Sequence, residues 1–213
     1  MIKRIASSLR KLRRTAGNAM IDLRFGGFVG GYQPNPIPGA NGTGATDYAL
    51  MPQIFDGRIK PDDVLVDVGC GYGRVINWWL YRGHQNKIFG LEILPEVAQH
   101  LRRRLRKYSQ VTILTGDAIA NLPPEGTLFF LFNPFGLAEI LERFLDRAWE
   151  IYRVQPGLRI LYFAPVLLDV ARSDPRWQTE LIPLALPAVG FFEERHRHLA
   201  IITPRSAVSP SLT

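Results

Sequence analysis

The chain has 213 residues, 46% of them hydrophobic and 21% charged, which suits one globular domain with a sizeable core and a small appendage. It has no run of about eighteen apolar residues, so we expect no membrane span. No apolar signal region follows its basic N-terminus, so we expect no secretory signal, and the cytoplasm is the default compartment. The single cysteine, Cys70, excludes an internal disulfide and a cysteine-rich zinc site, while the net charge of +7 favours an anionic partner.

Residues 1–20 carry a basic amphipathic pattern that predicts a helix. Its apolar residues recur at helical spacing: Ile2, Ile5, Leu9, Leu12 and Ala16. Basic residues lie among them: Lys3, Arg4, Arg10, Lys11, Arg13 and Arg14. Two interpretations stay open, because such a helix can bind an anionic surface, either membrane or RNA, or can pack on the domain with its charges in water.

Residues 25–47 show no periodicity and are rich in Gly, Pro, Asn and Thr, so they predict a loop or arm. A connection of this length is usually functional or disordered. A short helix is expected to open within residues 47–52 and to lead to Phe55. The predicted organisation is a basic helix and Gly/Pro-rich arm over residues 1–47, a folded domain over 48–205 and a flexible tail over 206–213.

The domain begins with a predicted strand over residues 64–68, buried on both faces, with Asp67 at its carboxyl end. Gly69, Gly71 and Gly73 follow at every second position and allow positive φ and close approach of a ligand. Strand, glycine turn and helix together are typical of the place where an open α/β sheet binds a nucleotide-like ligand. The long Arg74 occupies the third position of a dinucleotide fingerprint, and no P-loop pattern is present, which disfavours both of those sites.

The run from Asp67 to Gly73 resembles motif I of the class I S-adenosylmethionine (SAM)-dependent methyltransferases. The resemblance implies the Rossmann-like α/β fold of that family: a seven-stranded, mostly parallel sheet with helices on both faces and an antiparallel last strand. It implies SAM as the cofactor and no metal, with Asp67 helping to hold the amino group of SAM. Gly69, Cys70, Gly71 and Gly73 would pass beside the methionine part, and Cys70 would be a small filler residue.

A longer pattern is similar to a largely uncharacterised bacterial group of these proteins. The pattern is Asp-Leu-Arg-Phe-Gly at residues 22–26, a glycine-rich stretch, a Tyr/Pro segment, the Gly-Cys-Gly-x-Gly-Arg turn, and Phe-Asn-Pro-Phe at residues 132–135. Before a SAM site, the Gly/Pro-rich arm is expected to act as a lid over cofactor and substrate.

Two later strand ends are expected to complete the cofactor site. Residues 87–92 predict a strand ending in Glu92, which the resemblance implies accepts hydrogen bonds from both ribose hydroxyls, with Ile93 packed on the adenine. Residues 111–114 predict the next strand, and Asp117 and the backbone N–H of Ala118 are implied to bind the adenine. Glu92 alone does not separate SAM from a dinucleotide, since an acid at this place also marks the ribose in dinucleotide folds.

The strongly apolar residues 127–132 predict a further buried strand, which ends in Asn133-Pro134-Phe135-Gly136. This end resembles the [Asn/Asp/Ser]-Pro-Pro-aromatic motif of amino-methyltransferases, except that Phe135 replaces the second proline and Gly136 the aromatic residue. The resemblance implies that Asn133, Pro134 and Phe135 form the catalytic end of the site. The Asn133 side chain and the following carbonyl would orient the target nitrogen beside the cofactor. Alternatively, Asn133 caps the next helix.

The remaining pattern predicts a helix over 138–152, a strand over 159–163, a short helix or loop over 165–171, and an antiparallel pair of strands over 177–184 and 198–203. A basic cluster closes the helix that begins at Pro95 and is expected to lie in water or, alternatively, to contact RNA: Arg102, Arg103, Arg104, Arg106 and Lys107.

The expected function is methyl transfer from SAM to an acceptor nitrogen of unknown identity. No histidine is placed as an obvious general base, and an alcohol or phenol acceptor would need one. Three alternatives stay open: an O-methyltransferase of a small molecule or glycan, an NAD-dependent oxidoreductase, and a SAM-fold module that binds RNA or membrane without catalysis. The expected location is cytoplasmic, with peripheral membrane attachment as an option.

Overall fold

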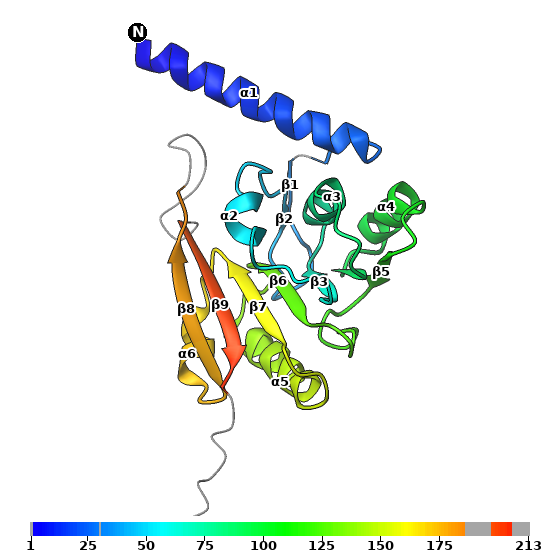
Figure 1. Ribbon diagram of the computed structural model, residues 1–213, viewed down its shortest axis with the longest axis vertical. Coiled ribbons are helices and arrows are strands. Elements are labelled where there is room, and N and C mark those ends of the chain that lie inside the picture. The colour runs from blue at the N-terminus through cyan, green and yellow to red at the C-terminus, as the bar shows by residue number, and fades with distance from the viewer. Residues whose placement is uncertain (1, 30, 186–196, 206–213) are drawn as a thin grey trace, which may run out of the picture.

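A seven-stranded sheet forms the centre of the molecule in the computed structural model, which describes residues 2–29, 31–185 and 197–205, the first ten of these by backbone alone (Figure 1). The strands are β3 (Leu65–Val68), β4 (Ile88–Glu92), β5 (Val111–Thr115), β6 (Leu128–Phe132), β7 (Arg159–Phe163), β8 (Trp177–Pro183) and β9 (His198–Pro204). Their spatial order is β5-β4-β3-β6-β7-β9-β8, and β3 to β7 pair in parallel. β9 is antiparallel to both of its neighbours, which confirms the predicted sheet.

Helices cover both faces of this sheet because its central strands are apolar on both sides. In β6, Leu128 and Phe130 join the core under α2 (Met51–Phe55), α3 (Arg74–Tyr81) and α4 (Pro95–Leu105). The alternate residues Phe129 and Leu131 join the core under α5 (Ala138–Val154) and α6 (Leu168–Ser173). Successive side chains of a strand point to opposite faces, so an unbroken apolar run requires two covering layers.

The N-terminal segment adds a long helix and a short ribbon to this core. Helix α1 (Ile2–Arg24) extends past the predicted residues 1–20 and crosses the top of the molecule in Figure 1. The arm is not the simple loop that was predicted, since β1 (Tyr32–Gln33) and β2 (Thr43–Gly44) pair antiparallel. Strands of two residues are too short to show a period of two. The domain limits stay a prediction, and the predicted tail, 206–213, lies outside the described residues.

No helix within the described residues is both long and apolar enough to cross a membrane.

Candidate active site

A cavity of about 750 Å³ opens at the carboxyl ends of β3, β4, β5 and β6, and the arm lines it from the other side. Because β3 to β6 are parallel, the residues that follow each strand meet at one edge of the sheet. The predicted site residues that line the cavity are Asp67, Gly69, Cys70, Gly73, Glu92, Ile93, Asp117, Ala118, Asn133, Pro134 and Phe135. Gly71 is the one predicted residue outside this lining, and its role is to shape the turn.

The glycine turn is held between Glu92 below and the arm above. Gly71 has φ 52°, and its N–H donates to Glu92 Oε2 at 2.8 Å. A Cβ at Gly71 would lie 2.3 Å from the Cγ2 atom of Thr43 in the arm, so any side chain there would have to displace Thr43. The other Glu92 oxygen accepts the N–H of Leu94 at 2.9 Å. Glu92 therefore fixes the turn, and each of its oxygens keeps a second lone pair for a ribose hydroxyl.

Asp67 presents a buried carboxylate without a complete set of partners. Its Oδ2 atom has no hydrogen-bond partner among the described residues. Burial, together with the nearby charge of Glu92, raises the pKa of Asp67 from 3.8 to about 8. Burial likewise raises the pKa of Glu92, against the hydrogen bonds from Leu94 and Gly71 that lower it. An unpartnered buried oxygen is costly, so a cationic amino group of a ligand fits this place.

The residues expected around the adenine lie at the open side of the cavity. The Asp117 carboxylate is exposed and accepts the backbone N–H of Ile119 at 2.9 Å. Ile93 and Ala118 are half-buried in the cavity wall. Cys70 is buried in the turn, and burial raises the pKa of its thiol well above its usual value. A thiol held in its neutral form is a poor nucleophile.

Asn133 turns its side chain towards β7 and does not cap the next helix. Its φ is 44°, a conformation that Asn tolerates better than most residues, and its Oδ1 accepts the Tyr162 hydroxyl at 2.9 Å. The N-cap residue of α5 is Leu137, without a side-chain cap, so the capping interpretation of Asn133 is wrong. Tyr162 lies in the core, and burial raises the pKa of its hydroxyl to about 12.

The arm clamps the end of β6 through Asn41. The Asn41 side-chain amide donates to the carbonyls of Asn133, at 2.8 Å, and Phe135, at 3.1 Å. Its backbone N–H donates to the Pro134 carbonyl at 2.9 Å. The two oxygens expected to orient a target nitrogen, Asn133 Oδ1 and Pro134 O, thus each accept one internal hydrogen bond and keep a second lone pair. The ring of Phe135 packs on Phe144 in the core, with 5.4 Å between ring centroids.

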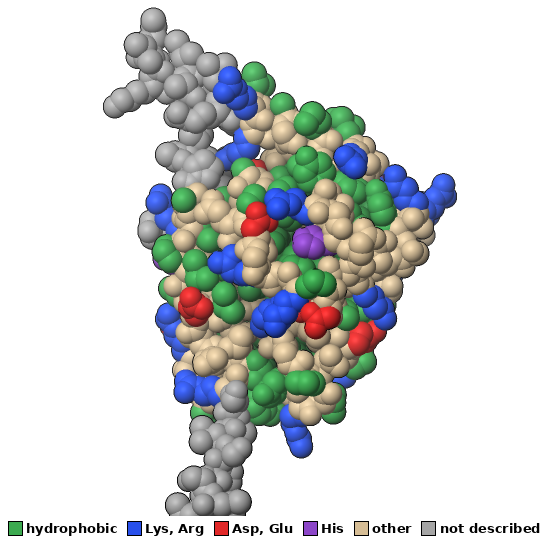
Figure 2. Space-filling model, in the orientation of Figure 1, with side chains coloured by type: hydrophobic (Ala, Val, Ile, Leu, Met, Phe, Trp, Pro, Cys, Tyr) green, Lys and Arg blue, Asp and Glu red, His purple; other side chains and the backbone are tan. Residues whose placement is uncertain are grey.

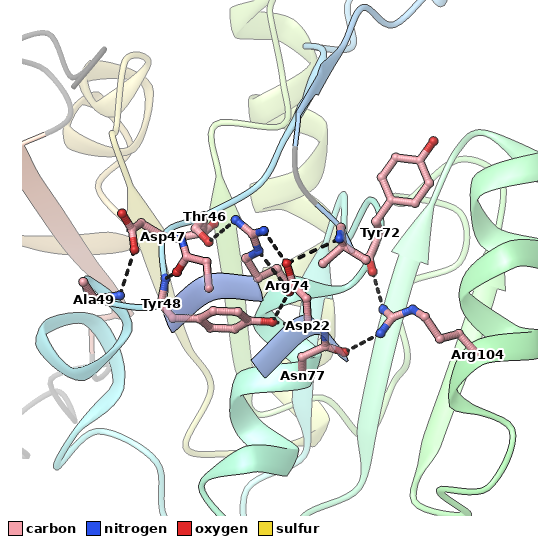
Figure 3. A network of polar contacts seen from close by, with 11 residues as sticks. Asp22, Thr46, Asp47, Tyr48, Ala49, Tyr72, Arg74, Asn77 and Arg104 are labelled. Atoms are coloured by element: carbon pink, nitrogen blue, oxygen red, sulfur yellow. Dashed lines mark hydrogen bonds and ion pairs between the residues drawn. The ribbon is translucent and has the colours of Figure 1, made fainter. Parts of the chain in front are cut away.

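A buried polar network joins α1 to the first residue after the glycine turn (Figure 3). Arg74 Nη2 lies 2.6 Å from Asp22 Oδ2, and the Tyr48 hydroxyl donates to Asp22 Oδ1 at 2.8 Å. The Arg74 guanidinium also lies over the Tyr48 ring, 5.2 Å from its centroid. Arg74, which occupies the third position of a dinucleotide fingerprint, therefore anchors helix α1 to the glycine turn.

Arg104 corrects the expectation for the basic cluster on α4. Its guanidinium donates to the carbonyls of Phe25, at 2.8 Å, and Tyr72, at 2.5 Å, and to Asn77 Oδ1 at 2.9 Å. Arg104 is therefore half-buried and ties the helix to the glycine turn and the arm, so its guanidinium does not extend freely into solvent as the rest of the cluster was expected to do.

Sequence patterns missed the contacts made by Asn41, Tyr162 and Asp22. Asn41 lies in an arm without periodicity, and Tyr162 looks like any core aromatic of a strand. Asp22 belongs to the residues 22–26 that resemble the bacterial group, but its spacing from Arg74 in the sequence does not predict that the two side chains meet. Within the described residues, no group of three His, Cys, Asp or Glu side chains is placed to hold a metal.

The fold and the cavity define an α/β domain that binds a nucleoside-like cofactor at the carboxyl ends of its parallel strands. Residues 65–154 match the family model described as a methyltransferase domain. This methyltransferase domain contains the motif residues that line the cavity, from Asp67 to Phe135.

Relatives of this chain carry methyltransferase names. Over 120 residues it is 26% identical to a protein of Saccharolobus solfataricus named "Probable cobalt-precorrin-6B C(15)-methyltransferase (decarboxylating)", with 54% of this chain and 59% of that protein covered. The chain thus spans less than two thirds of that relative.

Solved structures share the fold. A methyltransferase from Pyrococcus furiosus superimposes with a TM-score of 0.60 at 18% identity, over 91% of this chain and 97% of the other. The glycopeptide N-methyltransferase MtfA in complex with SAM superimposes with a TM-score of 0.56 at 14% identity, over 76% and 89%.

Proposed function

We propose that this protein transfers the methyl group of SAM to a nitrogen atom of an acceptor bound between the arm and the end of β6. The observation that carries the proposal is the convergence in one cavity of Asp67 and Glu92 on one side and Asn133 on the other. The first two are buried carboxylates suited to a cationic, hydroxyl-bearing cofactor, and the third is a polar group at the place where this fold carries out chemistry.

Each cofactor contact has a physical basis in this chain. The unpartnered Asp67 oxygen would accept the amino group of the methionine part, and Glu92 would accept the ribose hydroxyls with the lone pairs that Gly71 and Leu94 leave open. Asp117 and the backbone N–H of Ala118 would form hydrogen bonds with the adenine. Bound SAM supplies a methyl group already activated by a positive sulfonium, so the chain has to supply position and exclusion of water.

The lining of the cavity favours nitrogen over oxygen as the acceptor. Among its described residues there is no histidine or lysine, and its carboxylates, Asp67, Glu92 and Asp117, are those assigned to the cofactor. A neutral amine carries its own lone pair and can release a proton to water after transfer, whereas an alcohol needs a base. Asn133 would direct the nitrogen lone pair with its free Oδ1 lone pair, and the Tyr162 hydroxyl would hold that side chain in place.

Isotope transfer identifies the acceptor atom. The protein is incubated with a cell extract and SAM carrying a labelled methyl group, and products are identified by mass spectrometry. A labelled N-methyl product supports the proposal. Label on oxygen or carbon would retain a methyltransferase but overturn the choice of nitrogen, and no label at all would favour a binding module.

Asn133→Ala and Tyr162→Phe test the acceptor side of the site. We expect Asn133→Ala to lower kcat on the identified acceptor about a hundredfold, because the orienting contact is lost. Tyr162→Phe should lower kcat about tenfold without moving KM for SAM, since it removes the hydroxyl that holds the Asn133 side chain and leaves the predicted cofactor residues in place. SAM binding by calorimetry is the control and should be unchanged in both. Full activity of Asn133→Ala would contradict the proposal that Asn133 orients the acceptor nitrogen.

A further inference from the structure

One face of α1 is docked on the domain by specific contacts. Arg14 Nε lies 2.8 Å from Asp47 Oδ2, and Asn18 Oδ1 accepts the Tyr48 N–H at 3.2 Å. Further along the same face, Asp22 holds Arg74 and Ile21 packs on the core. Positions 14, 18, 21 and 22 share one side of an α-helix. These contacts fix which side of α1 faces away from the protein.

The opposite face of α1 is apolar and exposed. Leu12 is 67% exposed, Met20 71% and Leu23 55%, and Ala16 between them is also exposed. These four residues, at spacings of four and three, form what we call the outer stripe. In the sequence, Ile2, Ile5 and Leu9 continue the same helical phase towards the N-terminus. The outer stripe therefore does not pack on its own domain.

Basic residues accompany the outer stripe along the helix. Residues 2–24 contain one acid, Asp22, which is buried and paired with Arg74. Apart from Arg14, which is paired with Asp47 on the docked face, they contain these basic residues: Lys3, Arg4, Arg10, Lys11, Arg13 and Arg24. The helix thus carries most of the net charge of +7. Along the upper edge of Figure 2, where α1 lies, apolar and basic side chains share the surface.

We propose that α1 binds an anionic lipid bilayer, lying in the plane of the interface with the outer stripe inserted and its basic residues among the headgroups. A helix with one apolar face, a basic polar face and low overall hydrophobicity has this as its stable environment. Helix α1 lies along the outer edge of the α/β body (Figure 1), and the exposed side chains of the stripe are accessible to a flat surface.

The chemistry of the helix favours lipid over two other occupants. RNA would gain little from the outer stripe, since Leu, Ala and Met offer no aromatic face on which bases stack. A second copy of α1 would bring two strongly positive helices together, and like charges at a contact are repulsive. An anionic bilayer satisfies both the apolar stripe and the positive charge.

Vesicle binding by the full chain tests this proposal. We expect sedimentation with vesicles of equal phosphatidylcholine and phosphatidylglycerol, and at least tenfold weaker binding to phosphatidylcholine alone. Met20→Glu should weaken binding to the anionic vesicles about tenfold or more, because it places a charge in the inserted face. Val154→Glu is the matched control, since this residue is 76% exposed, lies at the end of α5 and undergoes the same change of charge. Its binding should be unchanged.

A fluorescence readout separates insertion from simple charge attraction. The chain has four tryptophans of its own, so the signal of Met20→Trp is its difference from the unchanged chain. With anionic vesicles this difference should shift to shorter wavelength and be quenched by lipids brominated on the acyl chain. Equal loss of binding in Met20→Glu and Val154→Glu, or no quenching in Met20→Trp, would overturn the proposal. Salt-sensitive binding to an unstructured RNA that Met20→Glu leaves intact, without vesicle binding, would assign the helix to RNA instead.

Discussion

Asp22→Asn should destabilise the protein strongly, although Asp22 lies at the end of an N-terminal helix. Asp22 is the carboxylate partner of Arg74 at 2.6 Å, and the two side chains are 2% and 10% exposed. Removing one member of a buried pair leaves the other charge uncompensated, at a cost of about 3–5 kcal/mol. With a urea dependence of about 2 kcal/mol/M, the unfolding midpoint should fall by about 1.5–2.5 M.

The control is an ion pair of equal length at the surface. Arg147 and Glu150 also lie 2.6 Å apart, but their side chains are 39% and 62% exposed. Exposed pairs contribute about 0–1 kcal/mol, so Glu150→Gln should leave the midpoint almost unchanged. Both variants are measured by urea unfolding followed by circular dichroism. Similar midpoints for Asp22→Asn and Glu150→Gln would refute the argument, because the two ion pairs have the same length and Asp22 differs from Glu150 in its burial and in its further hydrogen bond from Tyr48.

The remaining predictions concern the cofactor site. The folded protein holds the proton of Asp67 up to about pH 8, whereas the unfolded chain releases it near pH 4. The free energy of unfolding should therefore fall as the pH rises from about 4 to about 8. Asp67→Asn should flatten the slope of Tm against pH over this range. Calorimetric SAM affinity should rise over the same window as the carboxylate forms, and a pH-independent affinity would contradict this role. Glu92→Gln should weaken SAM binding at least about tenfold, since an NH₂ group then faces a backbone donor of the turn or a ribose hydroxyl. Gly71→Ala should destabilise the protein more than Gly57→Ala, measured by Tm, because both have positive φ but only Gly71 would collide with Thr43.

Local patterns determined the sheet and the placement of the predicted cofactor residues around one cavity. An apolar run such as 128–132 has one stable environment, between two covering layers, and parallel strands bring the residues after each strand to one edge. Asp67, Glu92 and Asp117 therefore lie at the same cavity although they are about 25 residues apart in the chain. The amphipathic pattern of residues 1–20 likewise predicted α1, since periodicity alone specifies a helix.

Only the tertiary structure decided which side chains of different segments meet. Arg74 and Asp22 are 52 positions apart, and Asn41 meets Asn133 across 92. Arg104 was predicted on a solvated face, but it is half-buried and donates to the backbone carbonyls of Phe25 and Tyr72. The direction of the apolar face of α1 was equally open, because a helical period gives the angles between side chains and leaves the helix free to rotate about its own axis. Long-range polar contacts and the orientation of a helix depend on distances through space, which a linear pattern does not contain.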